Sequence, residues 1–228
     1  MGYSTFYEDG LYPLQNKVLS IAECAFNGQF YLTGGTALSR CYFHHRYSDD
    51  LDFFSMSALP DLEPFARRLW DLLKEAGYEI SCDRLSPSFC SFFCGHKGVS
   101  LKVDMVNDVV VHHGDIQRTD LFTSVDNVGN ILSNKITAIT RCEAKDVADI
   151  WVIARNRPFV WRDLLADEGK KEGVDPLMVA HLLRTAPVEI LEKVKWITPV
   201  KMPLLQADLT RIAEDVLLGR ANSLYFTK

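Results

Sequence analysis

The stretch from residue 30 to residue 55, FYLTGGTALSRCYFHHRYSDDLDFFS, constrains the fold more than any other part of the chain. It opens with a short apolar run that predicts a buried strand. The adjacent Gly34 and Gly35 then allow a sharp turn, because neither residue carries a Cβ. Thr36 stands where a helix N-cap is expected, which predicts a short helix over residues 37–42. A diglycine turn that opens a helix presents backbone N–H groups and a positive dipole end, which suit a phosphate.

A second strand is predicted directly afterwards, over residues 50–54. Residues two apart on a strand share a face, so Asp50 and Asp52 are expected to point one way while Leu51 and Phe53 point into the core. Adjacent carboxylates repel each other unless they are solvated or a hard cation lies between them. Taken singly, the two features fit an ordinary tight turn and a solvated strand face. Together they predict a site that holds phosphates at one end and magnesium at the other.

The motifs GGTAL at residues 34–38 and SDDLD at residues 48–52 resemble the signature of the nucleotidyltransferase superfamily. Their spacing is closest to the AbiEii/AbiGii toxin branch, which includes the MenT toxins, and the resemblance runs from about residue 14 to about residue 154. It implies an α+β fold: a polymerase β-like mixed sheet flanked by helices, with a helical C-terminal subdomain. We expect a catalytic domain over residues 1–128 and the helical subdomain over residues 129–228.

A third acidic residue follows from the resemblance. Residues 99–106 alternate as a strand does, with Lys102 and Asp104 on one face and apolar residues on the other. In the superfamily, a strand beside the Asp-x-Asp strand supplies a third carboxylate, and Asp104 stands in the matching place. Many members of the toxin branch have Glu there. The resemblance therefore implies that Asp50, Asp52 and Asp104 hold Mg²⁺ or Mn²⁺.

Two later helices, predicted over residues 130–141 and 144–154, resemble further motifs of the toxin branch. Lys135 matches the lysine that contacts the nucleotide triphosphate, and Asp146 matches an essential aspartate after it. Judged by the residues alone, these could be surface helices with ordinary charge neighbours. The resemblance implies that the catalytic residues are Asp50, Asp52, Asp104, Lys135 and Asp146, and that the nucleotide-binding residues are Gly34, Gly35, Thr36, Ser48 and Lys135.

The hydrophobic pattern of the rest of the sequence is typical of a protein with both helices and strands. Helical spacing predicts helices over residues 12–26 and from residue 60 to Gly77, and the segments 78–85, 89–94 and 99–106 predict an antiparallel continuation of the sheet. Further helices are expected at the end of the chain, over residues 161–168, 175–185, 187–195 and 202–218. The paired histidines His44-His45 and His112-His113 are expected in loops or at edges, because neighbours on a strand point to opposite faces.

Net charge and amino-acid composition limit the class of protein and the cellular location that the sequence predicts. The net charge of −5 and the pI near 5.7 argue against a dedicated, high-affinity nucleic-acid binder, although a local basic patch is compatible with them. No apolar run has the length of a membrane span, and no secretory signal is expected at the N-terminus. The six cysteines are scattered, which predicts reduced thiols, mostly in the core, and a cytoplasmic location.

The resemblance implies a metal-dependent enzyme that transfers a nucleoside monophosphate from a nucleoside triphosphate to an acceptor hydroxyl. The implied acceptor is a tRNA 3′ end, and the implied setting is a type IV-like toxin–antitoxin or phage-defence system with a cognate antitoxin. Two alternatives stay open. The protein could modify a protein hydroxyl, or it could bind nucleotide without turnover. Acidic composition leaves the protein-modifying alternative open, whereas intact Asp50, Asp52, Asp104 and Lys135 favour turnover.

Overall fold

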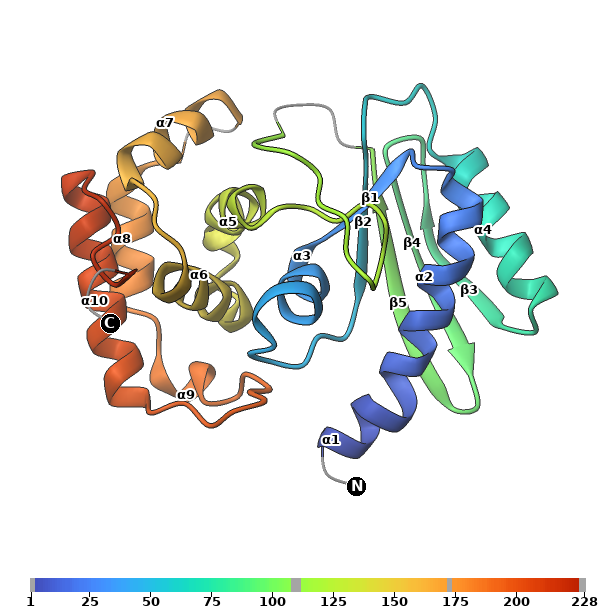
Figure 1. Cartoon of the computed structure of the whole chain (residues 1–228), viewed down its shortest axis with the longest axis horizontal. Coiled ribbons are helices and arrows are strands. Elements are labelled where there is room, and N and C mark those ends of the chain that lie inside the picture. Colours follow the sequence, from blue (N-terminus) through green and yellow to red (C-terminus); the bar gives the residue numbers. More distant parts are fainter. Residues whose placement is uncertain (1–2, 108–111, 172–173, 226–228) are drawn as a thin grey trace. The chain divides into compact units, whose positions relative to one another are not determined.

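The computed structural model describes residues 3–107, 112–171 and 174–225 (Figure 1). The chain divides into two compact units, Met1–Asn127 and Val128–Lys228. The first is a mixed five-stranded sheet with helices, and the second is helical, so the α+β class predicted from the sequence is confirmed. Within the described ranges, no helix is both long and apolar enough to cross a membrane.

The sheet has the strand order β1-β2-β5-β4-β3. Three neighbouring pairs, β1–β2, β5–β4 and β4–β3, run antiparallel, but β2 and β5 run parallel. The predicted antiparallel continuation was therefore wrong at this junction, because the chain crosses over through helix α4 (Glu63–Glu75) and the β3–β4 hairpin before β5 joins β2. The strands are β1 (Phe30–Thr33), β2 (Leu51–Ser55), β3 (Glu79–Leu85), β4 (Phe89–His96) and β5 (Val99–Val106).

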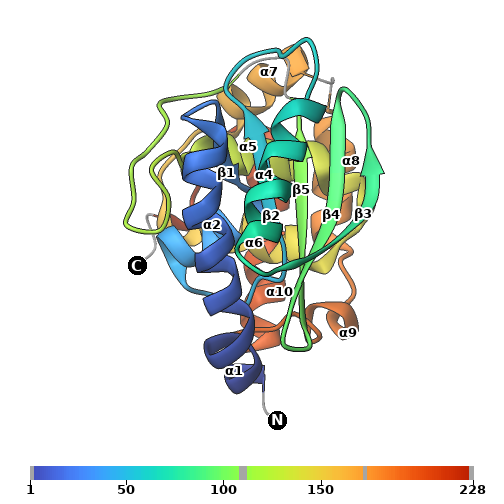
Figure 2. The same cartoon turned by 90° about the vertical axis from the view of Figure 1, so that its right-hand side faces the viewer.

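Two helices, α2 (Tyr12–Phe26) and α4, cover one face of the sheet (Figure 2). Phe26 of α2 packs on Phe53 with ring centroids 5.0 Å apart, and Trp70 of α4 packs on Phe92 at 5.7 Å. The alternating apolar residues of β2 and β5 point into this core and are fully buried. Ahead of α2, the chain is already helical through α1 (Tyr3–Phe6) and η1 (Tyr7–Leu11).

The helix after β1 begins earlier than predicted. It runs through α3 (Gly34–Ala37) and η2 (Leu38–Phe43), and Thr33 occupies the N-cap position with extended backbone. The N-cap role predicted for Thr36 is therefore wrong. Its side chain is buried, and its hydroxyl donates to the carbonyl of Asp50 and lies 2.9 Å from Ser48 Oγ. Thr36 ties this helix to the segment that leads into β2.

The second unit is built from helices packed around α6 (Ala144–Asn156), which contacts α5 (Val128–Thr137), α9 (Val188–Leu191) and α10 (Met202–Leu218). Trp151 Nε1 donates to Asp208 Oδ2 at 2.9 Å, which joins α6 to α10. Asp175 caps α8 by accepting from Leu177 N at 2.9 Å. The remaining elements of this unit are η3 (Ala138–Arg141), α7 (Trp161–Lys171) and α8 (Pro176–Arg184).

All six cysteines are free thiols. Burial raises the pKa of Cys90 to about 12 and that of Cys94 to about 11, so both remain neutral in the core. The prediction that most cysteines fill the core is wrong, because Cys24, Cys82 and Cys142 are exposed.

Candidate active site

The parallel pairing of β2 with β5 brings two of the predicted carboxylates together. Asp52 and Asp104 are direct partners in the register of this pair. Both alternate with fully buried apolar residues, so they lie on the sheet face opposite α2 and α4. Asp50 stands one residue before β2, so the strand begins later than predicted. The Asp104 side chain is 17% exposed, which leaves it open to solvent.

A lysine accompanies these carboxylates. Lys102 Nζ lies 2.6 Å from Asp104 Oδ2, two residues along the same face of β5. Partial burial lowers the pKa of Lys102, but the hydrogen bond to Asp104 and the charges of Asp104, Asp50 and Asp52 outweigh it and leave the pKa raised. The strand alternation placed Lys102 beside Asp104, but sequence reasoning gave it no role.

The donor set at this face suits a divalent cation. Hard cations take carboxylate oxygens, and Asp104 Oδ1 is buried without a hydrogen-bond partner among the described residues. Ser91, its register partner on β4, also has a buried hydroxyl without a partner in the described part of the chain. In residues 3–107, 112–171 and 174–225, no three acidic, histidine or cysteine side chains are already arranged as a metal site. The predicted ligands therefore fit an ion chemically but would have to rearrange around it.

The diglycine turn lies against the same carboxylates. Gly34 has φ +70°, and a Cβ there would collide with Asp52 Oδ2. A Cβ at Gly35 would collide with Arg46 Nη2 and approach Ser48 Oγ to 3.1 Å. Arg46 is buried and donates from Nη1 to the carbonyl of Tyr47 at 3.0 Å. Only glycine leaves room for these side chains, so the turn and the acidic strand fit each other closely.

This close fit predicts that Gly34→Ala impairs the site more than backbone strain alone would. Gly28→Ala is the matched control, because Gly28 has φ +76° and open space where its Cβ would be. Both variants should lose about 1–2 kcal/mol of unfolding free energy from the positive φ. Gly34→Ala alone should lose nucleotidyl transfer, by about a hundredfold, because it displaces Asp52. Urea unfolding and initial rates measure both effects, and equal rates for the two variants would contradict the fit.

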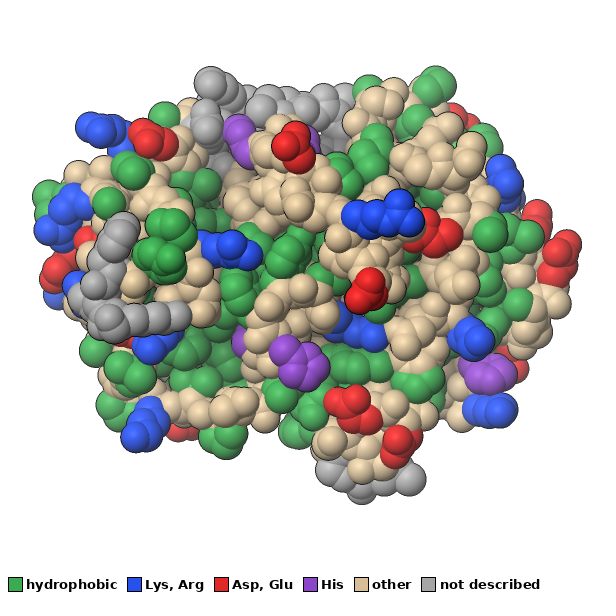
Figure 3. Space-filling model, viewed as in Figure 1, with side chains coloured by type: hydrophobic (Ala, Val, Ile, Leu, Met, Phe, Trp, Pro, Cys, Tyr) green, Lys and Arg blue, Asp and Glu red, His purple; other side chains and the backbone are tan. Residues whose placement is uncertain are grey.

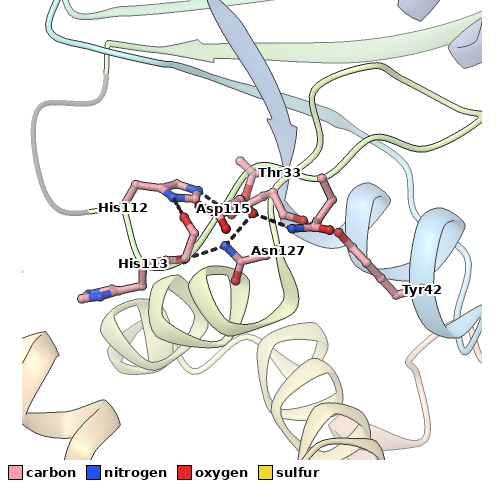
Figure 4. Close-up of polar contacts among 9 residues, drawn as sticks. Thr33, Tyr42, His112, His113, Asp115 and Asn127 are labelled. Atoms are coloured by element: carbon pink, nitrogen blue, oxygen red, sulfur yellow. Dashed lines mark hydrogen bonds and ion pairs between the residues drawn. The ribbon is translucent and has the colours of Figure 1, made fainter.

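A buried aspartate that sequence reasoning missed holds Thr33, the residue before the turn, which Figure 4 labels together with His112 and Tyr42. Asp126 is fully buried, and Thr33 Oγ1 donates to its Oδ2 at 2.6 Å. His112 Nε2 lies 3.0 Å from Asp126 Oδ1, while His112 Nδ1 lies 2.8 Å from the carbonyl of Gly114. Both ring nitrogens face oxygen atoms, so His112 bridges Asp126 and the carbonyl of Gly114. Tyr42 OH donates to the Asp126 carbonyl at 2.6 Å, which joins η2 to the same residue.

We expect Thr33→Val to weaken nucleotide use through this network. The change removes one donor to a buried carboxylate, which should cost about 1–3 kcal/mol of unfolding free energy and raise KM for nucleotide. Thr123→Val is the control, because the Thr123 hydroxyl donates to the Glu23 carboxylate at the same 2.6 Å but is exposed. If the two variants show the same KM and the same unfolding free energy, Thr33 does not support the turn.

In the second unit, the predicted lysine and aspartate contact each other. Lys135 Nζ lies 2.6 Å from Asp146 Oδ1 and 2.9 Å from Asp149 Oδ2. Lys135 and both carboxylates are buried, which excludes the surface-helix interpretation. Asp149 is a residue that the predicted set lacked, and its signal was the Asp-x-x-Asp spacing, which places both carboxylates on one side of α6.

The family profile of the nucleotidyl transferase AbiEii toxin, type IV toxin–antitoxin system, matches residues 18–222. The chain belongs to the AbiEii family. Its fold is also similar to the crystal structure of JHP933 from Helicobacter pylori, with a TM-score of 0.59, 16% identity and 90% of each chain covered. A candidate nucleotidyltransferase from H. pylori is similar with a TM-score of 0.57 and 16% identity, covering 95% of this chain and 97% of that one. A comparison with curated proteins finds no match.

This AbiEii nucleotidyltransferase also has a polar pocket of about 870 Å³ in its first unit, formed by α2, η2 and the loop over residues 118–123. Arg40 and Arg118 line it. Arg40 donates to Gln15 Oε1 at 3.0 Å and to Asn16 Oδ1 at 2.6 Å, which fixes its guanidinium. Arg40 lies in η2, which follows directly on the α3 segment that Gly34 opens, so a residue of the pocket and the diglycine turn belong to one continuous helical stretch.

Proposed function

We propose that this AbiEii protein transfers a nucleoside monophosphate from a nucleoside triphosphate to the 3′ hydroxyl of an RNA, a tRNA in the first instance, and that a cognate antitoxin counteracts it. One observation carries the proposal: Asp52 and Asp104 are register partners on parallel strands, and Gly34 of the diglycine turn lies against Asp52. Carboxylates beside a phosphate-binding turn match the needs of phosphoryl chemistry, which depends on positioning and charge compensation.

In this proposal, the backbone N–H groups at Gly34 and Gly35 bind the β- and γ-phosphates, and Thr36 and Ser48 hold that turn against the acidic segment. The acceptor hydroxyl forms a bond to the α-phosphorus while the bond from that phosphorus to the bridging oxygen breaks, and pyrophosphate leaves. Asp50, Asp52 and Asp104 would hold the divalent ions. Such ions, when bound, neutralise phosphate charge and lower the pKa of the attacking hydroxyl.

Lys135 is proposed to bind the triphosphate, as in the family motif. The structure of the second unit supports a precise orientation for it, since Asp146 and Asp149 both accept from its ammonium group. A lysine held by two buried carboxylates loses little further side-chain freedom when it meets a phosphate. Asp146 and Asp149 would then act as positioning residues for Lys135.

The acceptor is proposed to be RNA on the strength of the pocket. Arg40 and Arg118 provide cationic groups that can pair with phosphates, close to the turn that would hold the nucleotide. Acidic and basic side chains are interspersed on the face drawn in Figure 3, in keeping with the net charge of −5. Two acidic residues, Glu23 and Asp120, also line the pocket, so it carries no net positive charge and contact with an RNA phosphate depends on the two arginines alone.

The test is a transfer assay with nucleotides labelled on the α-phosphate, supplied singly with Mg²⁺ or Mn²⁺. Purified total tRNA is the acceptor in one arm and nuclease-treated cell extract in the other. Label in tRNA, abolished by Asp52→Asn, is the expected result. Label that appears only in protein would assign a protein acceptor. Nucleotide binding with no label in either arm would identify a binding module.

A further inference from the structure

The ammonium group of Lys102 lies on the acidic face of the sheet and pairs there with Asp104. It lies 2.6 Å from Asp104 Oδ2, and the charges of Asp50 and Asp52 also act on it. Three carboxylates and one ammonium leave a net charge of −2 at this face. Without the ammonium, the register partners Asp52 and Asp104 would face each other with like charge, which destabilises neighbouring strands.

The position of Lys102 conflicts with that of a divalent ion. An ion bound to Asp104 and Asp52 would meet the Lys102 ammonium at short range, and the two cations would repel each other. The Lys102 side chain is 35% exposed, so it has space to swing towards solvent. The flexible four-carbon side chain of Lys102 permits that movement at a small cost in free energy. The movement does, however, break the ion pair between the ammonium and Asp104.

We propose that Lys102 is a built-in counter-ion, which stabilises the carboxylates before substrate arrives and is displaced when a divalent ion enters together with nucleotide. The inference rests on the proposed function. A nucleoside triphosphate carries anionic oxygens that can accept the displaced ammonium, whereas a free ion brings no such partner. Lys102 therefore couples the two binding events: it weakens the binding of a free divalent ion more than that of an ion accompanied by nucleotide.

The experiment measures Mn²⁺ binding by calorimetry and by the spin resonance of free Mn²⁺, with and without a non-hydrolysable nucleotide analogue. Lys102→Met should bind free Mn²⁺ about tenfold more tightly than wild type. It should also melt at lower temperature in EDTA, because the like charges are no longer compensated. Lys102→Arg keeps the charge and should behave as wild type. Lys74→Met, at an exposed site on α4, is the control for loss of a lysine.

Each alternative outcome is decisive. Unchanged Mn²⁺ affinity and melting in Lys102→Met, or weaker Mn²⁺ binding, overturns the counter-ion role, while label transfer by wild type would leave the proposed function intact. If wild type binds no Mn²⁺ even with the analogue, the metal site itself fails, and the inference fails with it. Should Lys102→Met not fold, the double variant Lys102→Met with Asp104→Asn removes both charges. That variant should fold and show no dependence of melting on EDTA.

Discussion

Replacing Asp52 or Asp104 by asparagine is expected to reduce nucleotidyl transfer about a thousandfold without unfolding the protein. The two carboxylates are register partners on the solvent-accessible face of β2 and β5, so their removal leaves the apolar core untouched. Asparagine keeps the shape of the side chain but loses the negative charge that a divalent ion and its phosphates require. Asp52→Asn removes a charge that repels Asp104 but attracts Lys102, so its melting temperature without metal should stay close to that of wild type.

Initial transfer rates, circular dichroism and thermal melting measure these effects. Asp83→Asn on β3 is the matched control, because Asp83 is an exposed strand carboxylate outside the acidic face. Asp104→Asn also weakens a partly exposed pair with Lys102, which should cost about 1 kcal/mol or less. Transfer at the wild-type rate in both Asp52→Asn and Asp104→Asn would eliminate the mechanism.

Lys135→Met should have the second-largest effect and should act on both stability and nucleotide use. Removing the ammonium leaves Asp146 and Asp149 as neighbouring buried carboxylates, which should cost about 3–5 kcal/mol of unfolding free energy. If Lys135 also binds the triphosphate, KM for nucleotide should rise in any variant that folds. Urea unfolding measures the first effect, and steady-state kinetics with varied nucleotide measure the second.

A second substitution separates the two roles. Adding Asp149→Asn to Lys135→Met removes one of the two uncompensated buried charges and should restore part of the lost stability, while KM for nucleotide stays high. Lys193→Met, at an exposed lysine of the same unit, should change neither quantity. Restoration of both stability and KM in the double variant would show that Lys135 supports the fold and makes no contact with nucleotide.

Sequence reasoning was strongest where periodicity and chemistry agreed. The bounds predicted for α2, β5 and α10 were those observed, because apolar residues recur there at helical or strand spacing without interruption. It was weaker at the diglycine turn. Thr36 has the chemistry of an N-cap, but the helix starts at Gly34 because Gly34 adopts a positive φ directly after the strand. The residues next to Thr36 in the sequence could not reveal that its hydroxyl forms hydrogen bonds with the carbonyl of Asp50 and the hydroxyl of Ser48.

The site residues that the sequence did not predict contact residues that are far away along the chain. Asp126 lies in a stretch without periodicity, and its importance appears only when Thr33 and His112 reach it. Lys102 was placed on the correct face, but its role depends on β2 being the neighbour of β5 in parallel. The resemblance implied that the two strands are neighbours, but their parallel direction was not predicted, because the pattern of the three later strands is equally compatible with an antiparallel meander.

The insertion of β5 between β2 and β4 has a consequence for the order of events during synthesis. Fifty-two residues separate Asp52 from Asp104, so a ribosome needs about 3 to 10 seconds to pass from one to the other. A nascent chain that stops before Val99 contains the diglycine turn, Asp50 and Asp52, but it lacks strand β5 and Asp104. The acidic pair is completed late, when a distant segment closes the sheet, and a partly made toxin is therefore expected to be harmless to the cell that makes it.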